Sequence, residues 1–192
     1  MKKLVIALGV SALLGACAGS GGGMGMNSSS ASATPMVGGA PMYPTKDIVD
    51  NAVNSKDHTT LVAAVKAADL VATLKSPGPF TVFAPTNASF AALPAGTVDT
   101  LLKPENKATL TKVLTYHVVP GRMDSAALTS AINAGGGKAM LKTASGGTLT
   151  ATMSGGTVWV TDAKGGTAAV TIANVYQSNG VIHVVNKVLL PG

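Results

Sequence analysis

Three histidines, His58, His117 and His183, are the residues of this sequence that most readily suggest chemistry. We expect His117 and His183 to lie in neighbouring apolar strands. An enzyme would need two of these imidazoles near a carboxylate or a nucleophile, and a zinc site would need a third ligand. The expected folded part has no cysteine, and no His-x-x-x-His spacing occurs. We therefore interpret the histidines as hydrogen-bonded core residues and predict no metal site.

Other catalytic patterns are also missing from the sequence. No Gly-x-Ser-x-Gly elbow occurs, and many of the serines gather near the amino end. The 8 acidic residues are spread along the chain, mostly at expected helix starts or in loops such as the one around Asp162. Carboxylates in such places usually cap helices or face solvent. The sequence thus predicts a protein that is not an enzyme and needs no cofactor.

Aromatic side chains are the remaining candidates for a functional site, because exposed aromatics often anchor binding surfaces. Trp159 alternates with Val158 and Val160 in an expected strand, so it either contacts a partner or packs across the sheet. Tyr176 is a second, equally weak candidate. Tyr116 lies in an apolar run, and we expect it in the core with its hydroxyl paired.

The amino end has the pattern of a secretory signal peptide, which we assign to residues 1–16. Lys2 and Lys3 precede an apolar run from Leu4 to Leu14, and small residues follow. This run of about eleven residues is shorter than the roughly 20 that a membrane-spanning helix needs. The sequence therefore predicts export rather than a transmembrane helix at this end.

Cys17 is the only cysteine, and the segment that ends on it, from Leu14, resembles the lipobox of bacterial lipoproteins. The resemblance implies that Cys17 becomes a lipidated amino terminus that anchors the chain to the membrane of the cell envelope. Such a protein would be displayed in the periplasm or at the surface, on the outer membrane of a Gram-negative host. The alternative is an unmodified thiol inside an ordinary signal peptide.

Residues 17–44 differ in composition from the rest of the chain. Glycines, serines and three prolines dominate this range, so it buries too little apolar surface to fold alone. We assign residues 17–44 to the lipidated cysteine and a flexible tether, and residues 45–192 to one folded domain. A phosphate-binding glycine loop is the alternative, but no Lys-Ser or Lys-Thr pair follows the glycines and no expected strand precedes them.

The charge of the chain does not favour nucleic acid as a partner. Without Lys2 and Lys3, 12 basic and 8 acidic side chains remain, and the lysines are scattered singly. A nucleic-acid binder concentrates Lys and Arg beside stacking aromatics, whereas this chain has a single arginine, Arg122. Weak attraction to anionic glycans or lipid head groups stays open.

The first half of the expected domain reads as short helices around one strand. Thr45 is the expected N-cap of a helix to Val53, and a second helix is expected from Asp57 to Leu74. Residues 80–84 alternate β-branched and aromatic types and predict a strand that ends at Pro85. Shorter helices follow, and an apolar segment at residues 116–119 leads into a Pro-Gly turn.

The second half predicts a β-meander. Five β-rich runs cover residues 139–143, 148–153, 157–161, 169–173 and 181–185, and Gly-Gly or Asn-Gly pairs separate most of them. Both faces of the last run carry apolar residues, so we expect a central strand. Helices followed by strands give an α+β fold.

Three segments match conserved blocks of a known family in order and spacing. They are FTVFAPTNASF from Phe80, YHVVPG from Tyr116 and NGVIHVVNKVLLP from Asn179. In this respect the chain resembles the fasciclin domain family. The resemblance implies a fasciclin-like wedge of β-strands flanked by short helices, and an extracellular adhesion module that contacts a surface protein or glycan. Some fasciclin-like proteins bind pigments, so the alternative is a carrier of a small apolar ligand such as a pigment or lipid.

The matched blocks supply residues that we expect to be structural rather than catalytic. These are Phe83, Pro85, Thr86, Asn87, Phe90, Tyr116, His117, Pro120, Gly121, Gly180, His183 and Asn186. Asn186 departs from the family, which usually has an acidic residue there. An amide keeps the hydrogen-bonding capacity but loses the charge, so an acid-dependent contact does not carry over.

Overall fold

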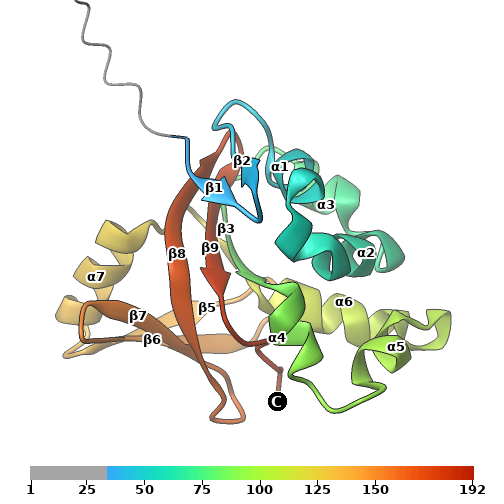
Figure 1. Ribbon diagram of the computed structural model, residues 1–192. Helices are drawn as coiled ribbons and strands as arrows, with labels where there is room; N and C mark the ends of the chain where they lie inside the picture. Colours follow the sequence, from blue (N-terminus) through green and yellow to red (C-terminus); the bar gives the residue numbers. More distant parts are fainter. Residues whose placement is uncertain (1–33) are drawn as a thin grey trace, which may run out of the picture. The chain divides into compact units, whose positions relative to one another are not determined.

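The computed structural model describes residues 34–192 (Figure 1). The predicted signal peptide of residues 1–16, Cys17 and the tether as far as residue 33 lie outside the described residues. Within the described part, strands form a strongly bent sheet on one side and most of the short helices gather on the other, whereas α7 (Ser125–Ala134) lies on the side of the sheet (Figure 1). The predicted α+β fold with a β-wedge and flanking helices is confirmed.

Residues 36–42 belong to the folded domain, so the prediction that the tether extends to residue 44 is wrong. β1 (Met36–Val37) and β2 (Ala40–Pro41) form an antiparallel hairpin. Gly38 and Gly39 make its turn with positive φ angles of 58° and 75°. Val37 and Met42 are buried. The burial of their apolar surface offsets the entropy that the segment loses on ordering, which its Gly-rich composition had suggested would keep it unfolded.

Four helical segments follow the hairpin: α1 (Ile48–Asn54), η1 (Lys56–His58), α2 (Thr59–Ala67) and α3 (Val71–Lys75). The N-cap of α1 is Asp47, whose side chain accepts from the Asp50 N–H at 2.8 Å, and not Thr45 as predicted. The expected single helix to Leu74 is divided, because Asp69 adopts a left-handed φ of 60° that ends α2.

The middle of the chain contains the next helices. They are α4 (Asn87–Ala91), α5 (Thr97–Leu102), η2 (Pro104–Asn106), α6 (Lys107–Tyr116) and α7 (Ser125–Ala134). Tyr116 ends α6 instead of starting a strand, because the helical hydrogen bonds continue to the C-cap His117. No clear sequence signal predicted α7, whose N-cap Asp124 accepts from the Ala127 N–H.

One sheet of seven strands positions every conserved block. The strands are β3 (Phe80–Pro85), β4 (Val118–Pro120), β5 (Lys138–Lys142), β6 (Thr148–Ser154), β7 (Thr157–Thr161), β8 (Thr167–Gln177) and β9 (Gly180–Val185). Their order is β4-β3-β9-β8-β7-β6-β5, with β3 and β9 parallel and the other pairs antiparallel. The sequence therefore placed the five-strand meander correctly.

Two clusters of apolar side chains pack against the two faces of the sheet. β9 is central and fully buried, as predicted. Ile182 and Val184 contribute to the cluster under α1, α2 and α6, whereas Val185 contributes to the cluster that includes α7. Alternation along a strand explains this division. None of the helices within residues 34–192 is long and apolar enough to cross a membrane.

Candidate binding surface

His117 is a buried structural residue at the C-cap of α6, not in a strand as we expected. Its Nε2 accepts from the Leu189 N–H at 3.0 Å, so the ring proton resides on Nδ1, which donates to the Val113 carbonyl at 2.8 Å. Burial lowers the pKa of His117 to about 4, because a second proton would be desolvated and would point at the Leu189 N–H. His117 is therefore neutral at pH 7.

His183 is also buried, and its ring stacks on Phe83 with centroids 5.6 Å apart. Nε2 lies 2.8 Å from the Met123 carbonyl oxygen and donates to it. Burial lowers the pKa of His183 below its ordinary value. Ring stacking and a backbone hydrogen bond give His183 a structural role in the core beneath α7.

His58 lies 2.9 Å from a hydroxyl, between its Nδ1 and the Oγ of Ser55. This contact resembles a nucleophile beside a base, but Ser55 is only 1% and His58 only 3% exposed. Burial also lowers the pKa of His58. A substrate cannot reach the pair in this conformation. Within residues 34–192, no three His, Cys, Asp or Glu side chains are grouped closely enough to hold a metal ion.

The first conserved block joins β3 to the helices. Pro85 ends β3, and Thr86 accepts from the Ser89 N–H as the N-cap of α4. Asn87 donates to the Lys56 carbonyl at 2.8 Å and accepts from the Thr60 N–H at 3.0 Å, and so ties α4 to η1 and to the start of α2. Phe90 is buried in the helix-side cluster. These residues stabilise the architecture and present no polar group to a ligand.

Tyr116 bridges two loops from its buried position. Its hydroxyl donates to the Thr148 carbonyl at 2.9 Å and accepts from the Ala163 N–H at 2.9 Å. Burial raises the pKa of Tyr116. The hydroxyl is thus paired inside the core, as its apolar sequence context suggested.

The conserved turn residues have backbone roles. Gly121 follows the exposed Pro120 and has a φ of 101°, and its N–H donates to the Pro79 carbonyl. A side chain at Gly180 would meet the Phe80 carbonyl oxygen at 2.2 Å, so the close approach of β3 and β9 requires glycine. Both glycines therefore serve the sheet.

Asn186 is exposed, and its Oδ1 accepts from the Ala169 N–H at 2.8 Å. An amide oxygen is sufficient for this backbone contact. The departure from the usual acidic residue therefore leaves the connection between β9 and β8 intact.

The two aromatic candidates do not come together. Trp159 is half-buried on β7, opposite Thr152 and Ala169 on the neighbouring strands. Tyr176 lies seven positions beyond Ala169 along β8, which is roughly 20 Å of strand. Trp159 packs across the sheet among small residues, whereas Tyr176 is 40% exposed near the β8–β9 turn.

Tyr176 forms one of two tyrosine–cation pairs around the β8–β9 turn. The Arg122 guanidinium lies over the Tyr176 ring, 5.7 Å from the ring centroid. The Tyr176 hydroxyl lies 3.4 Å from a carboxylate oxygen of Asp124. Nη2 of Arg122 donates to the carbonyls of Gln177 and Gly180, which fixes the guanidinium. Arg122 is exposed, and within the described part neither its Nε nor its Nη1 has a hydrogen-bond partner.

Tyr43 and Lys46 form the second pair, with the Lys46 ammonium 5.3 Å from the ring centroid. Tyr43 is 44% exposed. The Lys46 carbonyl accepts from the Ser178 N–H in the β8–β9 turn, which places this pair beside the same turn. An open hollow of about 330 Å³ lies between Arg122, Ser178 and the loop 77–79.

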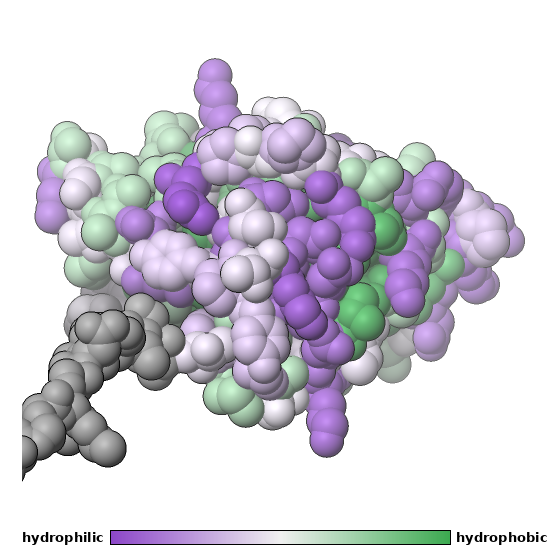
Figure 2. Space-filling view, turned by 90° about the horizontal axis from the view of Figure 1, so that it is seen from above, coloured by the Kyte–Doolittle hydropathy of each residue, from purple (hydrophilic) through white to green (hydrophobic). Residues whose placement is uncertain are grey.

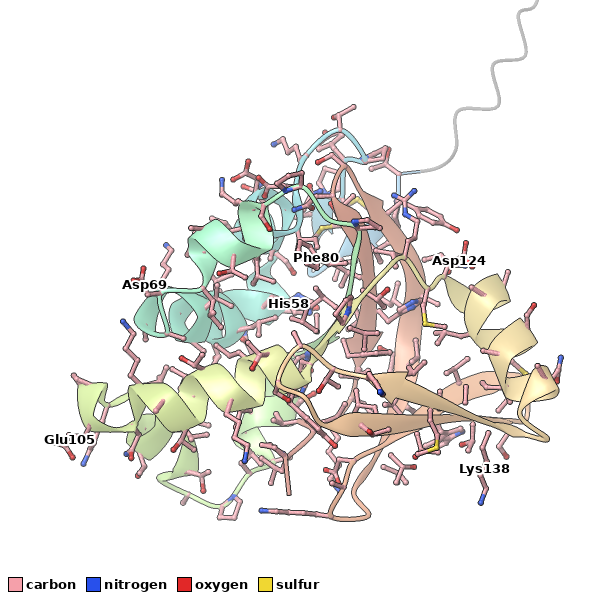
Figure 3. The ribbon with its side chains drawn as sticks, turned by 180° about the vertical axis from the view of Figure 1, so that it is seen from behind. His58, Asp69, Phe80, Glu105, Asp124 and Lys138 are labelled. Atoms are coloured by element: carbon pink, nitrogen blue, oxygen red, sulfur yellow. The ribbon has the colours of Figure 1, made fainter. Side chains whose placement is uncertain are left out.

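We call Tyr43, Lys46, Arg122, Tyr176 and the hollow at Arg122 the turn-end surface. Hydrophilic side chains cover much of the centre of the view from above, with residues of intermediate hydropathy among them (Figure 2). Asp124, which faces Tyr176, lies at the amino end of α7 (Figure 3). Of the four residues of this surface, the sequence had suggested only Tyr176 as a binding residue. Tyr43 was hidden in the predicted tether, and only the isolated arginine after the Pro-Gly turn was a signal for Arg122.

An apolar cavity of about 80 Å³ lies between β3 and the helices of the first half of the domain. Side chains of α1, α2, α3 and α6 line it, including Val49, Leu61, Leu74 and Leu114. Ligand pockets usually measure about 300–1,000 Å³. The cavity therefore holds a small apolar group at most, unless the helices move.

Comparison with known proteins agrees with this architecture. A sequence model described as "Fasciclin domain" matches residues 56–191. Protein sll1483 of Synechocystis sp. is 50% identical over 145 residues, which cover 75% of this chain and 73% of the relative. Immunogenic protein MPB70 of Mycobacterium bovis is 36% identical, with 73% of this chain and 66% of the relative covered.

A solved structure shows the same fold at low sequence identity. The FAS1 domain pair of the insect cell adhesion molecule Fasciclin I is similar with a TM-score of 0.68 at 15% identity, over 76% of this chain and 51% of that chain. Given the family match over most of the chain and the relative at 50% identity, this protein belongs to the fasciclin domain family.

Proposed function

We propose that this protein is a non-catalytic adhesion module, held at the cell envelope by a lipid on Cys17, whose turn-end surface binds a surface protein or glycan. The observation that carries the proposal is the pair of exposed tyrosine–cation contacts around the β8–β9 turn. The structural relation to a domain pair from an insect cell adhesion molecule supports the same class of function.

The chemistry of the turn-end surface suits recognition without turnover. Exposed tyrosine rings offer an apolar face and a polar hydroxyl at low entropic cost. The guanidinium of Arg122 adds N–H donors that match carboxylates and hydroxyl-rich ligands. The imidazoles of His58, His117 and His183 are buried, so they supply no accessible base.

Anchoring would strengthen such contacts without adding any new ones. Several acyl chains on one cysteine retain a protein at a membrane firmly. Many copies on one membrane then bind multivalently, and weak individual contacts add to a firm attachment. The predicted signal peptide and lipidated cysteine are therefore part of the proposed mechanism.

The proposal can be tested with cells that display the full chain. We expect Tyr43→Ala/Tyr176→Ala to reduce adhesion and aggregation to the level of a deletion strain. Val53→Ala/Met153→Ala is the matched control, because these side chains are 50% and 38% exposed, close to the 44% and 40% of the tyrosines. Adhesion should stay at the wild-type level in this control. Undiminished adhesion of the tyrosine variant, at equal display, would contradict the assignment of the surface.

The apolar cavity is the site of a second candidate function, the carriage of a small apolar ligand, which at this volume requires the helices over the cavity to move apart. A carrier purified from its native host should be coloured or should release a lipid or pigment into organic solvent. Leu61→Trp, which fills the cavity, should then abolish the retained ligand while leaving adhesion unchanged. A colourless protein without extractable ligand leaves the adhesion proposal as the better explanation.

A further inference from the structure

A groove of about 830 Å³ lies between β4, β5 and α7. Val119, Met123, Ala131 and Leu141 contribute apolar walls. Lys138, on the groove, lies beyond the carboxyl end of α7 and its side chain extends into solvent (Figure 3). Asp124 lies at the other end of α7, about 15 Å of helix away. Met123, in the groove wall, follows Arg122 in sequence, but the groove and the hollow at Arg122 have no lining residue in common.

The groove exists because the sheet does not close. β4 and β5 are the two ends of the strand order, and they approach where the Ala144 N–H donates to the Val118 carbonyl at 2.7 Å. Beyond this contact the two strands are not paired with each other. One edge of β5 consequently faces the groove.

The pairing register shows which backbone groups of β5 face the groove. The Thr143 N–H donates to the Gly147 carbonyl, so this pair is hydrogen-bonded across the hairpin. In an antiparallel ladder such pairs alternate with pairs that direct their N–H and C=O groups outward. Met140 pairs with Thr150, and Lys142 pairs with Thr148. The backbone N–H and C=O groups of Met140 and Lys142 therefore point away from β6. Within residues 34–192, no hydrogen bond from outside the β-ladder reaches the backbone N–H or C=O of either residue.

The side chains along this edge set the charge of a partner. Lys138, Met140 and Lys142 share the exposed face of β5, and Met140 is 77% exposed. No acidic residue lines the groove. An antiparallel second copy centred on Met140 would bring Lys138 opposite Lys142, and like charges directly opposite are destabilising. The edge therefore disfavours a second copy and favours an acidic strand.

We propose that the β4–β5 groove binds an extended acidic peptide, which adds to β5 as an eighth strand. The peptide's backbone hydrogen bonds to Met140 and Lys142, as in other cases of strand addition. Its acidic side chains pair with Lys138 and Lys142 on the exposed face, around an apolar residue opposite Met140. Side chains at the alternate positions point inward and cover Val119 and Leu141.

This arrangement specifies a probe peptide. The capped sequence TEVLVET places leucine opposite Met140 and glutamates opposite both lysines, and it reads the same in either strand direction. TKVLVKT is the control peptide with reversed charge. Binding of each fluorescent peptide to the full 192-residue chain is measured by anisotropy. We expect TEVLVET to bind and TKVLVKT to bind about tenfold more weakly or not at all.

Two matched double variants test the location. Lys138→Glu/Lys142→Glu should reverse the preference between the peptides. Lys164→Glu/Lys187→Glu changes the net charge equally at exposed positions on other loops, and it should leave the preference unchanged. The proposal is overturned if both variants respond alike, or if TEVLVET does not bind at about 1 mM.

Amide hydrogen exchange provides the second measurement. The Met140 and Lys142 amides should exchange more slowly when TEVLVET is bound, since their N–H groups become paired. Unchanged exchange of these two amides at saturating peptide would also overturn the proposal, whatever the charge variants show.

Discussion

Replacing His117 with glutamine removes an imidazole that is held neutral in the folded state. Its Nδ1 donates to the Val113 carbonyl and its Nε2 accepts from the Leu189 N–H, so a second proton has no place in the native structure. The unfolded chain has no such restriction. We therefore predict that His117 makes the free energy of unfolding fall as the pH falls.

The magnitude follows from the two pKa values. The pKa of His117 is about 4 in the folded protein and 6.5 as the ordinary value. Above pH 6.5 both states are neutral and His117 has no pH-dependent effect. Between pH 6.5 and pH 4 only the unfolded state binds the proton, which destabilises the fold by about 2 kcal/mol at pH 5 and about 3 kcal/mol at pH 4.

Urea unfolding of the wild type and His117→Gln at pH 7, 5 and 4 tests this reasoning. Glutamine cannot make both hydrogen bonds as well, so the variant should lose about 1–3 kcal/mol at pH 7. The wild-type advantage should then shrink toward pH 4, because the variant lacks the titrating group. His58 and His183 also have lowered pKa values, but both proteins contain them, so their effects cancel.

NMR titration of the folded wild type gives an independent check that does not depend on the variant. The imidazole signals of His117 should remain those of the neutral ring until the pH approaches 4. Titration of His117 near pH 6.5 in the folded protein, or an unfolding free energy that falls equally in both proteins, would refute the assigned hydrogen bonds.

Three further predictions concern other positions. Tyr116→Phe leaves the two backbone groups that the hydroxyl bridges without a partner, so urea unfolding should show a loss of about 1–3 kcal/mol, and an unchanged midpoint would contradict the bridge. Asn186→Asp keeps an oxygen for the Ala169 N–H and should change stability by less than about 0.5 kcal/mol, whereas Asn186→Ala should cost about 1 kcal/mol. Wild-type cells should incorporate a fatty-acid analogue into this protein and Cys17→Ala cells should not, and equal labelling would exclude Cys17 as the anchor.

The β-rich half of the fold could be predicted because its signals are local. Glycine pairs between short β-branched runs specify hairpins, and apolar residues on both faces of β9 specify a central strand. Helix ends were harder to predict. The hairpin at Gly38 is fixed by the Lys56 N–H, which donates to the Gly38 carbonyl, whereas its local sequence resembles a linker. The left-handed Asp69 interrupts a run of apolar residues whose pattern resembles one continuous helix.

The histidines show which properties of a site local sequence can predict and which it cannot. Their apolar surroundings and the absence of a ligand pattern indicated core residues. The tautomer and lowered pKa of His117 depend on the Leu189 N–H, which is 72 positions away in sequence. Only the packed structure brings these groups together.

The sequence by itself determined the family, the meander and the identities of the buried conserved residues, because each rests on short-range patterns. Only the tertiary structure decided which side chains and which strand edge are exposed for the proposed contacts. Tyr43 lies near the β8–β9 turn because Asn51 hydrogen bonds both to the Tyr43 backbone and to Gln177 at the end of β8. The open edge of β5 exists because β4 and β5 meet at one point and then separate. Exposure and edge pairing are properties of the whole sheet, and no local pattern encodes them.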